Sequence, residues 1–162
     1  MGAFEKVFRA LNKGKVKYLV VGGVAVNLYG YLRFTGDIDI LLLLEEKNLE
    51  KMDAVMKNLN YIERLPVSIK SLNDHKLVKK WLKEKNMTAY AFFPPVQTLL
   101  TIDVLVEDSL KFGKLIKTGI VKKFDNVNIP VVSIDYLIKM KKRAARPKDL
   151  EDLDNLIKLK NL

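Results

Sequence analysis

Two aspartates at the start of an apolar segment are the residues best suited to chemistry in this chain. Asp37 and Asp39 open the run DIDILLLL, and Gly22-Gly23 closes an earlier apolar run, YLVVGG. Because side chains alternate along a strand, Asp37 and Asp39 should point to the same face. Glycines at a helix start let a phosphate approach the backbone, and paired carboxylates hold divalent cations. The pattern predicts a site for metal and phosphate together.

The periodicity of apolar residues indicates the elements that must position these groups. A buried strand over 16–21 should lead into a helix over 23–28, and a second buried strand should cover 38–44. The other expected elements are helix 3–12, helix 47–59, strand 61–65, helix 73–85, strand 87–93, strand 98–106, helix 109–114, strands 116–123 and 127–132, a helix from an N-cap at Ser133 to Ala144, and a last helix with Pro147 in its first turn.

This element order predicts an α+β (mixed α/β) fold with a central mixed β-sheet flanked by helices. At 162 residues the chain should form a single domain, with a sheet-containing core over about 15–132 and C-terminal helices over 133–162. In the last helix, Leu150, Leu153 and Ile157 should form the apolar face, with Leu156 as a further candidate.

The composition restricts the kind of metal and partner. The chain has no cysteine and one histidine, so a metal would be a hard ion held by oxygen, such as Mg²⁺ or Mn²⁺. The formal net charge of +10 favours polyanionic partners, although a solvated lysine-rich surface would give the same balance. No apolar run is long enough for a membrane span and the N-terminus is unlike a secretory signal, so we expect a cytoplasmic protein without a membrane partner.

The spacing resembles the motif of the nucleotidyltransferase superfamily, the polymerase-beta-like fold. That motif is an apolar residue, Gly, Gly or Ser, about a dozen residues, and then Asp-apolar-Asp. The chain is more similar still to minimal nucleotidyltransferases of the AbiEii toxin type. Three stretches carry this likeness: Gly22-Gly23-Val24-Ala25-Val26-Asn27, Arg33-Phe34-Thr35, and the run from Lys141 through Arg146 to Lys148-Asp149.

The resemblance implies a third carboxylate, Asp103, on the strand at 98–106. Three carboxylates in apolar surroundings repel one another unless cations join them, and two Mg²⁺ or Mn²⁺ ions would relieve this and serve phosphoryl transfer. We therefore predict Asp37, Asp39 and Asp103 as catalytic and metal-binding residues. In the alternative reading, Asp37 caps a helix or turn, and Asp39 and Asp103 mark sheet edges.

Nucleotide-binding residues are expected around these carboxylates. Gly22 and Gly23 would approach the phosphates, and Arg33 would meet the triphosphate or the acceptor, with Thr35 beside it. By resemblance, Lys141 is the first candidate for a triphosphate contact, followed by Arg146 and Lys148. Each cation could instead belong to a solvated surface. Asp149 and Asp152 should favour the positive end of the last helix rather than bind metal.

The predicted activity is metal-dependent transfer of a nucleoside monophosphate from a nucleoside triphosphate to a hydroxyl. The AbiEii likeness implies an RNA acceptor, such as the 3′ end of tRNA, and an antitoxin partner. Alternatives are a protein or small-molecule acceptor, a non-catalytic RNA-binding relative, or a regulatory partner of an acidic antitoxin. The lysine-rich face of helix 73–85 could hold RNA or be solvated, Trp81 could stack on a base or anchor the core, and His75 reads as a surface residue.

Overall fold

The computed structural model describes residues 2–96 and 100–162. The helices and strands in order are α1 (Ala3–Lys13), β1 (Tyr18–Val21), α2 (Gly22–Tyr29), β2 (Asp37–Leu42), α3 (Glu46–Asn58), β3 (Ile62–Glu63), η1 (Ile69–Asn73), α4 (His75–Glu84), β4 (Ala89–Phe93), β5 (Thr101–Leu105), α5 (Val106–Ser109), α6 (Phe112–Leu115), β6 (Ile120–Phe124), β7 (Val127–Val131), α7 (Ile134–Ala144) and α8 (Pro147–Lys160).

The described strands form one seven-stranded sheet in the order β3-β4-β5-β2-β1-β7-β6. Strand β2 is interior, antiparallel to β1 and parallel to β5. Strand β7 pairs in parallel with β1 although more than a hundred residues separate them in the chain. The expected mixed sheet flanked by helices is therefore confirmed.

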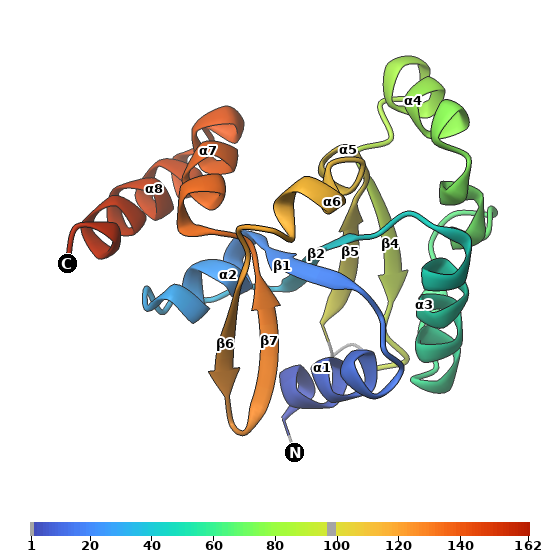
Figure 1. Cartoon of the computed structure of the whole chain (residues 1–162), viewed down its shortest axis with the longest axis horizontal. Coiled ribbons are helices and arrows are strands. Elements are labelled where there is room, and N and C mark those ends of the chain that lie inside the picture. Colours follow the sequence, from blue (N-terminus) through green and yellow to red (C-terminus); the bar gives the residue numbers. More distant parts are fainter. Residues whose placement is uncertain (1, 97–99) are drawn as a thin grey trace.

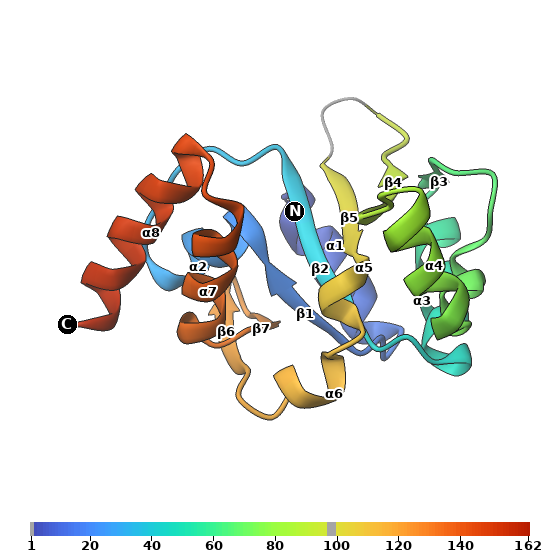
Figure 2. The same cartoon turned by 90° about the horizontal axis from the view of Figure 1, so that it is seen from above.

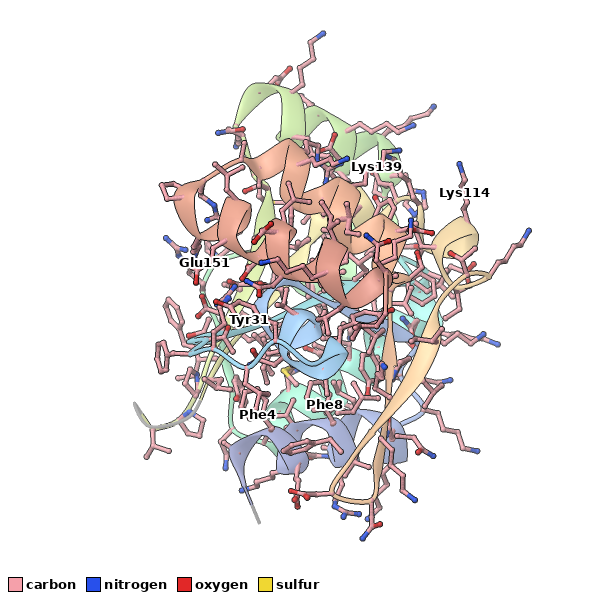
Figure 3. All side chains as sticks on the ribbon, turned by 90° about the vertical axis from the view of Figure 1, so that its left-hand side faces the viewer. Phe4, Phe8, Tyr31, Lys114, Lys139 and Glu151 are labelled. Atoms are coloured by element: carbon pink, nitrogen blue, oxygen red, sulfur yellow. The ribbon has the colours of Figure 1, made fainter. Side chains whose placement is uncertain are left out.

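The helices gather at both ends of the sheet and over its faces (Figures 1 and 2). Helices α7 and α8 pack on each other and on α2, whereas α3, η1 and α4 form the opposite end. Helix α1 packs on β7 and α3. Phe8 of α1 is buried and stacks on the ring of Tyr18 in β1. On the outer surface, the Lys139 side chain extends away from α7 (Figure 3). No helix built from the described residues is long and apolar enough to span a membrane.

Local chemistry explains where the C-terminal helices begin. The Oγ of Ser133 accepts a hydrogen bond from the Tyr136 amide at 3.1 Å, which confirms the predicted N-cap of α7. Pro147 is the first residue of α8, where its missing amide proton costs no helical hydrogen bond. The basic segment 141–148 therefore spans the last turn of α7, the two-residue connection and the first residues of α8.

The predicted apolar face of α8 is confirmed in part, because Leu156 is buried and Leu153 packs partly buried against the core. Leu150 is 52% exposed and Ile157 is 39% exposed, whereas the buried residues are Asp149, Asp152 and Leu156. The predicted and the buried residues both have helical spacing, and the buried set is shifted by one position along the sequence. The helix buries the charged stripe because cations from other elements pair with its two aspartates.

The other differences concern element ends. The expected strand 98–106 is observed as Thr101–Leu105, and residues 98 and 99 lie outside the described residues. The helix expected near 109–114 is two short helices, α5 and α6. The helix expected over 73–85 is α4, which begins at His75 after the 3-10 turn η1.

Candidate active site

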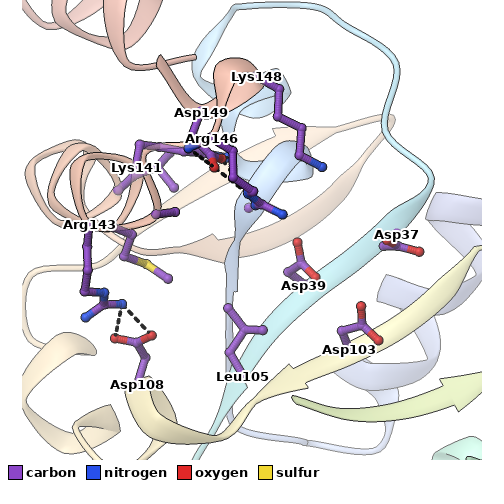
Figure 4. Close-up of a pocket in the computed structure, with 14 residues that line it drawn as sticks. Asp37, Asp39, Asp103, Leu105, Asp108, Lys141, Arg143, Arg146, Lys148 and Asp149 are labelled. Atoms are coloured by element: carbon purple, nitrogen blue, oxygen red, sulfur yellow. Dashed lines mark hydrogen bonds and ion pairs between the residues drawn. The ribbon is translucent and has the colours of Figure 1, made fainter. Parts of the chain in front are cut away.

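Three aspartates share one face of two neighbouring parallel strands (Figure 4). Asp39 of β2 lies directly opposite Asp103 of β5, and Asp37 precedes Asp39 by two residues on β2. Opposed residues in a ladder have their Cβ atoms roughly 5 Å apart, so the Asp39 and Asp103 side chains are neighbours. The alternative that these two residues mark sheet edges is wrong, because β2 and β5 are both interior.

The carboxylates of these aspartates lack cationic partners. Within residues 2–96 and 100–162, no hydrogen bond or ion pair reaches a side-chain oxygen of Asp37, Asp39 or Asp103. Burial, followed by the charges of Asp103 and Asp37, raises the pKa of Asp39 to about 6. Burial and the charge of Asp37 also raise the pKa of Asp103, and the charge of Arg64 lowers it in part. The protein leaves negative charge here for a ligand to neutralise.

The two glycines bring the start of α2 against these groups. Gly22 has a φ of 67° and follows Val21, the last residue of β1, which lies opposite Asp39 of β2. A Cβ on Gly22 would overlap the Asp39 carboxylate. A Cβ on Gly23 would lie 2.6 Å from Thr35 Oγ1 and 3.1 Å from Arg33 Nη2. Glycine is required at both positions, because the first turn of α2 meets the carboxylates and the 33–35 loop with no room for a side chain.

Two adjoining cavities surround the aspartates. The carboxylate cavity, of about 360 Å³, lies between β2, β5 and α7, and the loop cavity, of about 250 Å³, lies between α2 and the segment 33–37. The residues that line both are Asp37, Asp39, Lys141, Arg146 and Lys148. The carboxylates and the basic segment therefore face each other across one connected hollow (Figure 4).

Several of the predicted phosphate-binding cations are held by two buried aspartates. Lys141 Nζ lies 3.1 Å from Asp149 and 2.9 Å from Asp152. Arg33 makes two hydrogen bonds of 2.6 Å to the Asp152 carboxylate, and Arg146 Nε lies 2.6 Å from Asp149. We call these five residues the ion-pair hub. It joins the loop before β2 to α7 and α8.

The hub aspartates remain charged although both are 0% exposed. Burial alone would raise the pKa of Asp149 and Asp152, but hydrogen bonds from Arg146 and Lys141 lower the first and hydrogen bonds from Arg33 and Lys141 lower the second. Asp149 also accepts from the Arg146 amide at 3.2 Å, which caps the start of α8 as expected for an acidic residue there. The ion-pair role of both residues was missed by sequence reasoning.

The hub changes the order of the candidate phosphate contacts. Lys141 lines both cavities but is 6% exposed and engaged with two carboxylates. Arg146 is paired but exposed, and Lys148 is exposed with no acidic partner in the described part of the chain. In Figure 4 the Lys148 side chain extends over the hollow toward the aspartates. Lys148 and Arg146 are thus better placed than Lys141 to meet a ligand phosphate.

Two further residues of the hollow, Asp108 and Phe34, had only weak signals in the local sequence. Asp108 lines the carboxylate cavity, is buried, and accepts hydrogen bonds from Arg143 and from the Tyr136 hydroxyl. Its position after a predicted strand was the sole clue. Phe34, at the rim of the loop cavity, is 89% exposed. An apolar residue within the otherwise polar segment 33–37 could have indicated it.

The aspartates suit a divalent metal by their chemistry. They offer oxygen donors alone, they lie in register, and they lack a protein cation. As the described side chains stand, no three His, Cys, Asp or Glu are already arranged to hold one ion. The site is therefore an open pair of carboxylates on neighbouring strands with a third beside it, rather than a closed cage.

No protein-family model matches the sequence, and no curated protein matches it. The lincomycin-bound lincosamide antibiotic adenylyltransferase LnuA aligns with a TM-score of 0.66 over 97% of this chain and 96% of its own, at 14% identity. The antibiotic-resistance factor ANT(2'')-Ia aligns with a TM-score of 0.61 over 95% of this chain and 80% of its own, at 11% identity.

A Thermotoga maritima protein, provisionally classed as a nucleotidyltransferase, has a TM-score of 0.57 over 96% of this chain and 90% of its own, at 16% identity. Each of these alignments covers at least 95% of this chain. The chain has the nucleotidyltransferase fold.

Proposed function

We propose that this protein is a metal-dependent nucleotidyltransferase, which transfers a nucleoside monophosphate from a nucleoside triphosphate to a hydroxyl group. The observation that carries the proposal is the in-register pair of Asp39 and Asp103, without a protein cation, beside the glycine start of α2. The fold supports it, since the aligned structures include two antibiotic-modifying proteins, one of them named an adenylyltransferase.

Two Mg²⁺ or Mn²⁺ ions are proposed as cofactors. Asp37 and Asp39 would hold the ion that accompanies the triphosphate, and Asp39 and Asp103 would hold the other. When bound, such ions neutralise charge on the transferred phosphoryl group and on the leaving pyrophosphate.

Asp103 is the proposed general base. The acceptor oxygen forms a bond to the α-phosphorus, the bond from that phosphorus to the bridging oxygen breaks, and pyrophosphate leaves with the electron pair. The hydroxyl proton passes to the Asp103 carboxylate. Burial and the charge of Asp37 raise the pKa of Asp103, which makes this carboxylate a stronger base than an exposed aspartate.

The remaining residues bind and orient the triphosphate. The free amides at the start of α2, at Gly22 and Gly23, suit a phosphate oxygen. Lys148 and Arg146 face the same hollow and would bind the outer phosphates. Through the hub, Lys141 and Arg33 fix the wall that carries them. Thr35 packs against Gly23 and shapes the loop.

For the acceptor we propose RNA, such as the 3′ end of tRNA. The net charge of +10 supports a polyanionic acceptor. The AbiEii resemblance adds a toxin role in the cytoplasm and an antitoxin partner to the proposal. A non-catalytic RNA-binding protein is less consistent with three carboxylates gathered on one sheet face beside the glycine start of α2.

A small-molecule hydroxyl is the second candidate acceptor. LnuA is described with lincomycin bound, and ANT(2'')-Ia with adenylyl-2''-tobramycin, and both align over most of this chain. A protein hydroxyl remains a third, less supported acceptor.

The test is incubation with each α-labelled nucleoside triphosphate, Mg²⁺ or Mn²⁺, and either total tRNA or a panel of hydroxylated antibiotics, with Asp39→Asn as control. Label on tRNA that requires Asp39 would establish the RNA acceptor, and label on an antibiotic would establish the second candidate. Equal labelling by wild type and Asp39→Asn would exclude the mechanism.

A further inference from the structure

A third cavity lies beside helix α4, away from the ion-pair hub. This α4 cavity, of about 470 Å³, is lined by the segment 64–67, by Trp81 of α4, by residues 85–87 and by Ala89 of β4. Helices α7–α8 and helix α4 stand on opposite sides of strands β2 and β5 (Figure 2). The cavity is of a size that holds a nucleobase or a nucleotide.

The register of β4 and β5 puts the α4 cavity on the same sheet face as the catalytic aspartate. Ala89 lies opposite Leu105, and Ala91 lies opposite Asp103. Directly opposed residues share a face, so Ala89, which lines the α4 cavity, and Leu105, which lines the carboxylate cavity, point the same way. The β4 residues on this face are Ala89, Ala91 and Phe93, and Ala91 is 5% exposed. The line from Asp103 to the α4 cavity on this face therefore runs over Ala91 and Ala89.

The surface around this cavity is basic. Lys85, which follows α4, lines the cavity together with exposed Arg64, and α4 itself carries four further exposed lysines and a single acidic residue, Glu84. Across the described chain, no ion pair involves Arg64 or any of these lysines, which are Lys76, Lys79, Lys80, Lys83 and Lys85. Elsewhere, exposed lysines such as Lys57 and Lys158 do pair with aspartates. The charge pattern is complementary to a phosphodiester backbone.

Trp81 adds an aromatic surface to the cationic one. It is half-buried and lines the cavity together with Lys85 and Asn86. Single-strand nucleic acid sites combine a basic groove with aromatic side chains on which bases stack. Asn86 offers both a donor and an acceptor to the edge of a base. An acidic protein would be complementary to the lysines, but that complementarity would not involve Trp81 at the wall of the cavity.

We propose that Arg64, Trp81 and the α4 lysines form the acceptor site for a single-stranded RNA 3′ end. In this arrangement, which rests on the proposed nucleotidyl transfer, a base near the 3′ end stacks on Trp81 and the phosphates follow the lysines. The terminal hydroxyl then reaches Asp103 across β4. Its oxygen attacks the α-phosphorus, its proton goes to Asp103, and pyrophosphate leaves on the α7–α8 side.

The binding test needs neither triphosphate nor metal. Trp81 is the only tryptophan in the chain, so its fluorescence reports directly on the proposed site. Titration with a short single-stranded RNA should quench it, and Lys83→Gln/Lys85→Gln should weaken binding about tenfold and lower the salt slope of log K by about 1.4. The matched control is Lys6→Gln/Lys13→Gln, which removes two exposed lysines of α1. Unquenched fluorescence, or equal weakening in the two double variants, would overturn the proposal.

The transfer test separates this proposal from the proposed function. Lys83→Gln/Lys85→Gln should raise KM for RNA about tenfold and leave KM for the triphosphate unchanged. Trp81→Ala should weaken RNA binding while Trp81→Phe keeps it, as measured by anisotropy of labelled RNA.

Transfer to RNA at wild-type KM in the lysine variant would overturn the acceptor site alone. RNA bound at α4 without transfer from any triphosphate would overturn the proposed function and leave α4 as an RNA-binding surface. Binding of an acidic peptide but not RNA would overturn the acceptor site.

Discussion

The Asp39 carboxylate occupies the space in which a side chain on Gly22 would lie. Gly22 also has a φ of 67°, a backbone conformation that costs an ordinary L-residue about 1–2 kcal/mol. The turn from β1 into α2 therefore packs directly against the Asp39 side chain, and the contact leaves no room for a Cβ at Gly22.

Gly22→Ala should therefore lower both stability and activity. Backbone strain and overlap with Asp39 together should reduce the free energy of unfolding by about 2 kcal/mol or more. Urea unfolding followed by circular dichroism measures this loss. Gly113→Ala is the matched control, since nothing lies within 4 Å of its added Cβ. Equal stability of the two variants would contradict the close fit.

Asp39→Asn should stabilise the metal-free protein above pH 6. Asp39 has a pKa of about 6 in the fold against an ordinary 3.8, so its ionisation opposes folding. The stability that neutral Asp39 contributes is complete below about pH 4 and lost as pH rises through 6. With allowance for solvent screening, the variant should gain about 1–2 kcal/mol at pH 8, or roughly 3–6 °C in Tm.

Thermal unfolding in chelator at pH 4 and pH 8 measures this effect. The difference between variant and wild type should appear at pH 8 and vanish at pH 4. Mg²⁺ with a triphosphate should then raise the Tm of the wild type and leave the variant unchanged. A less stable variant at pH 8 would show that Asp39 has a cationic partner after all.

Asp152→Ala should be strongly destabilising. It removes the partner of Arg33 and one partner of buried Lys141, and an uncompensated buried charge costs about 3–5 kcal/mol. The control is Asp154→Ala, two residues after Asp152 on α8, which breaks an exposed ion pair with Lys158. It should lower the free energy of unfolding by less than about 1 kcal/mol. Denaturant midpoints of the two variants make the comparison, and similar losses would contradict the structural role of the hub.

The hub should also fail in acid. The pKa of Asp152 is lowered below 3.8, because hydrogen bonds from Arg33 and Lys141 outweigh burial. Its contribution to stability is present above about pH 4 and is lost as pH falls toward the lowered pKa. The stability gap between wild type and Asp152→Ala should narrow below pH 4, measured by unfolding at stepped pH. If the difference in stability between wild type and Asp152→Ala stays constant below pH 4, the charge of Asp152 is not the source of its stabilising effect.

Lys148→Gln should impair triphosphate binding rather than folding. Lys148 lines both cavities, is exposed, and has no acidic partner in the part of the chain described. Loss of one charge-assisted contact should raise KM for the triphosphate about tenfold with little change in Tm. Lys142→Gln, at an exposed position of α7 outside both cavities, is the control. If Lys148→Gln and Lys142→Gln have the same KM for the triphosphate, Lys148 does not contact the triphosphate.

Local rules were enough to predict the pair Asp37 and Asp39, because alternation along a strand needs no knowledge of the rest of the fold. They could not place Asp103, since its register pairs it with Asp39, a residue more than sixty positions earlier in the chain. The resemblance to a known motif, not periodicity, supplied that residue. Ser133 and Pro147 were recognised because caps and first turns are local as well.

The hub was missed because hydrophobic periodicity scores apolar residues alone. On α8 that criterion chose Leu150 and Ile157, whereas the helix buries Asp149 and Asp152. A buried aspartate can be predicted only when its cationic partners are known, and here they come from the loop before β2 and from α7. The same long-range pairing engages Lys141 with two aspartates, whereas Lys148 is exposed. The triphosphate contact of each stays a prediction.

The pairing of β7 with β1 has a consequence for biosynthesis. Strand β1 and the aspartates of β2 leave the ribosome early, but β7, which closes the other side of β1, is made more than a hundred residues later. The cations that face the aspartates follow later still, at 141–148. Such distant contacts slow folding. The nascent chain should therefore gain triphosphate binding in a single late step, once α7 and α8 have emerged.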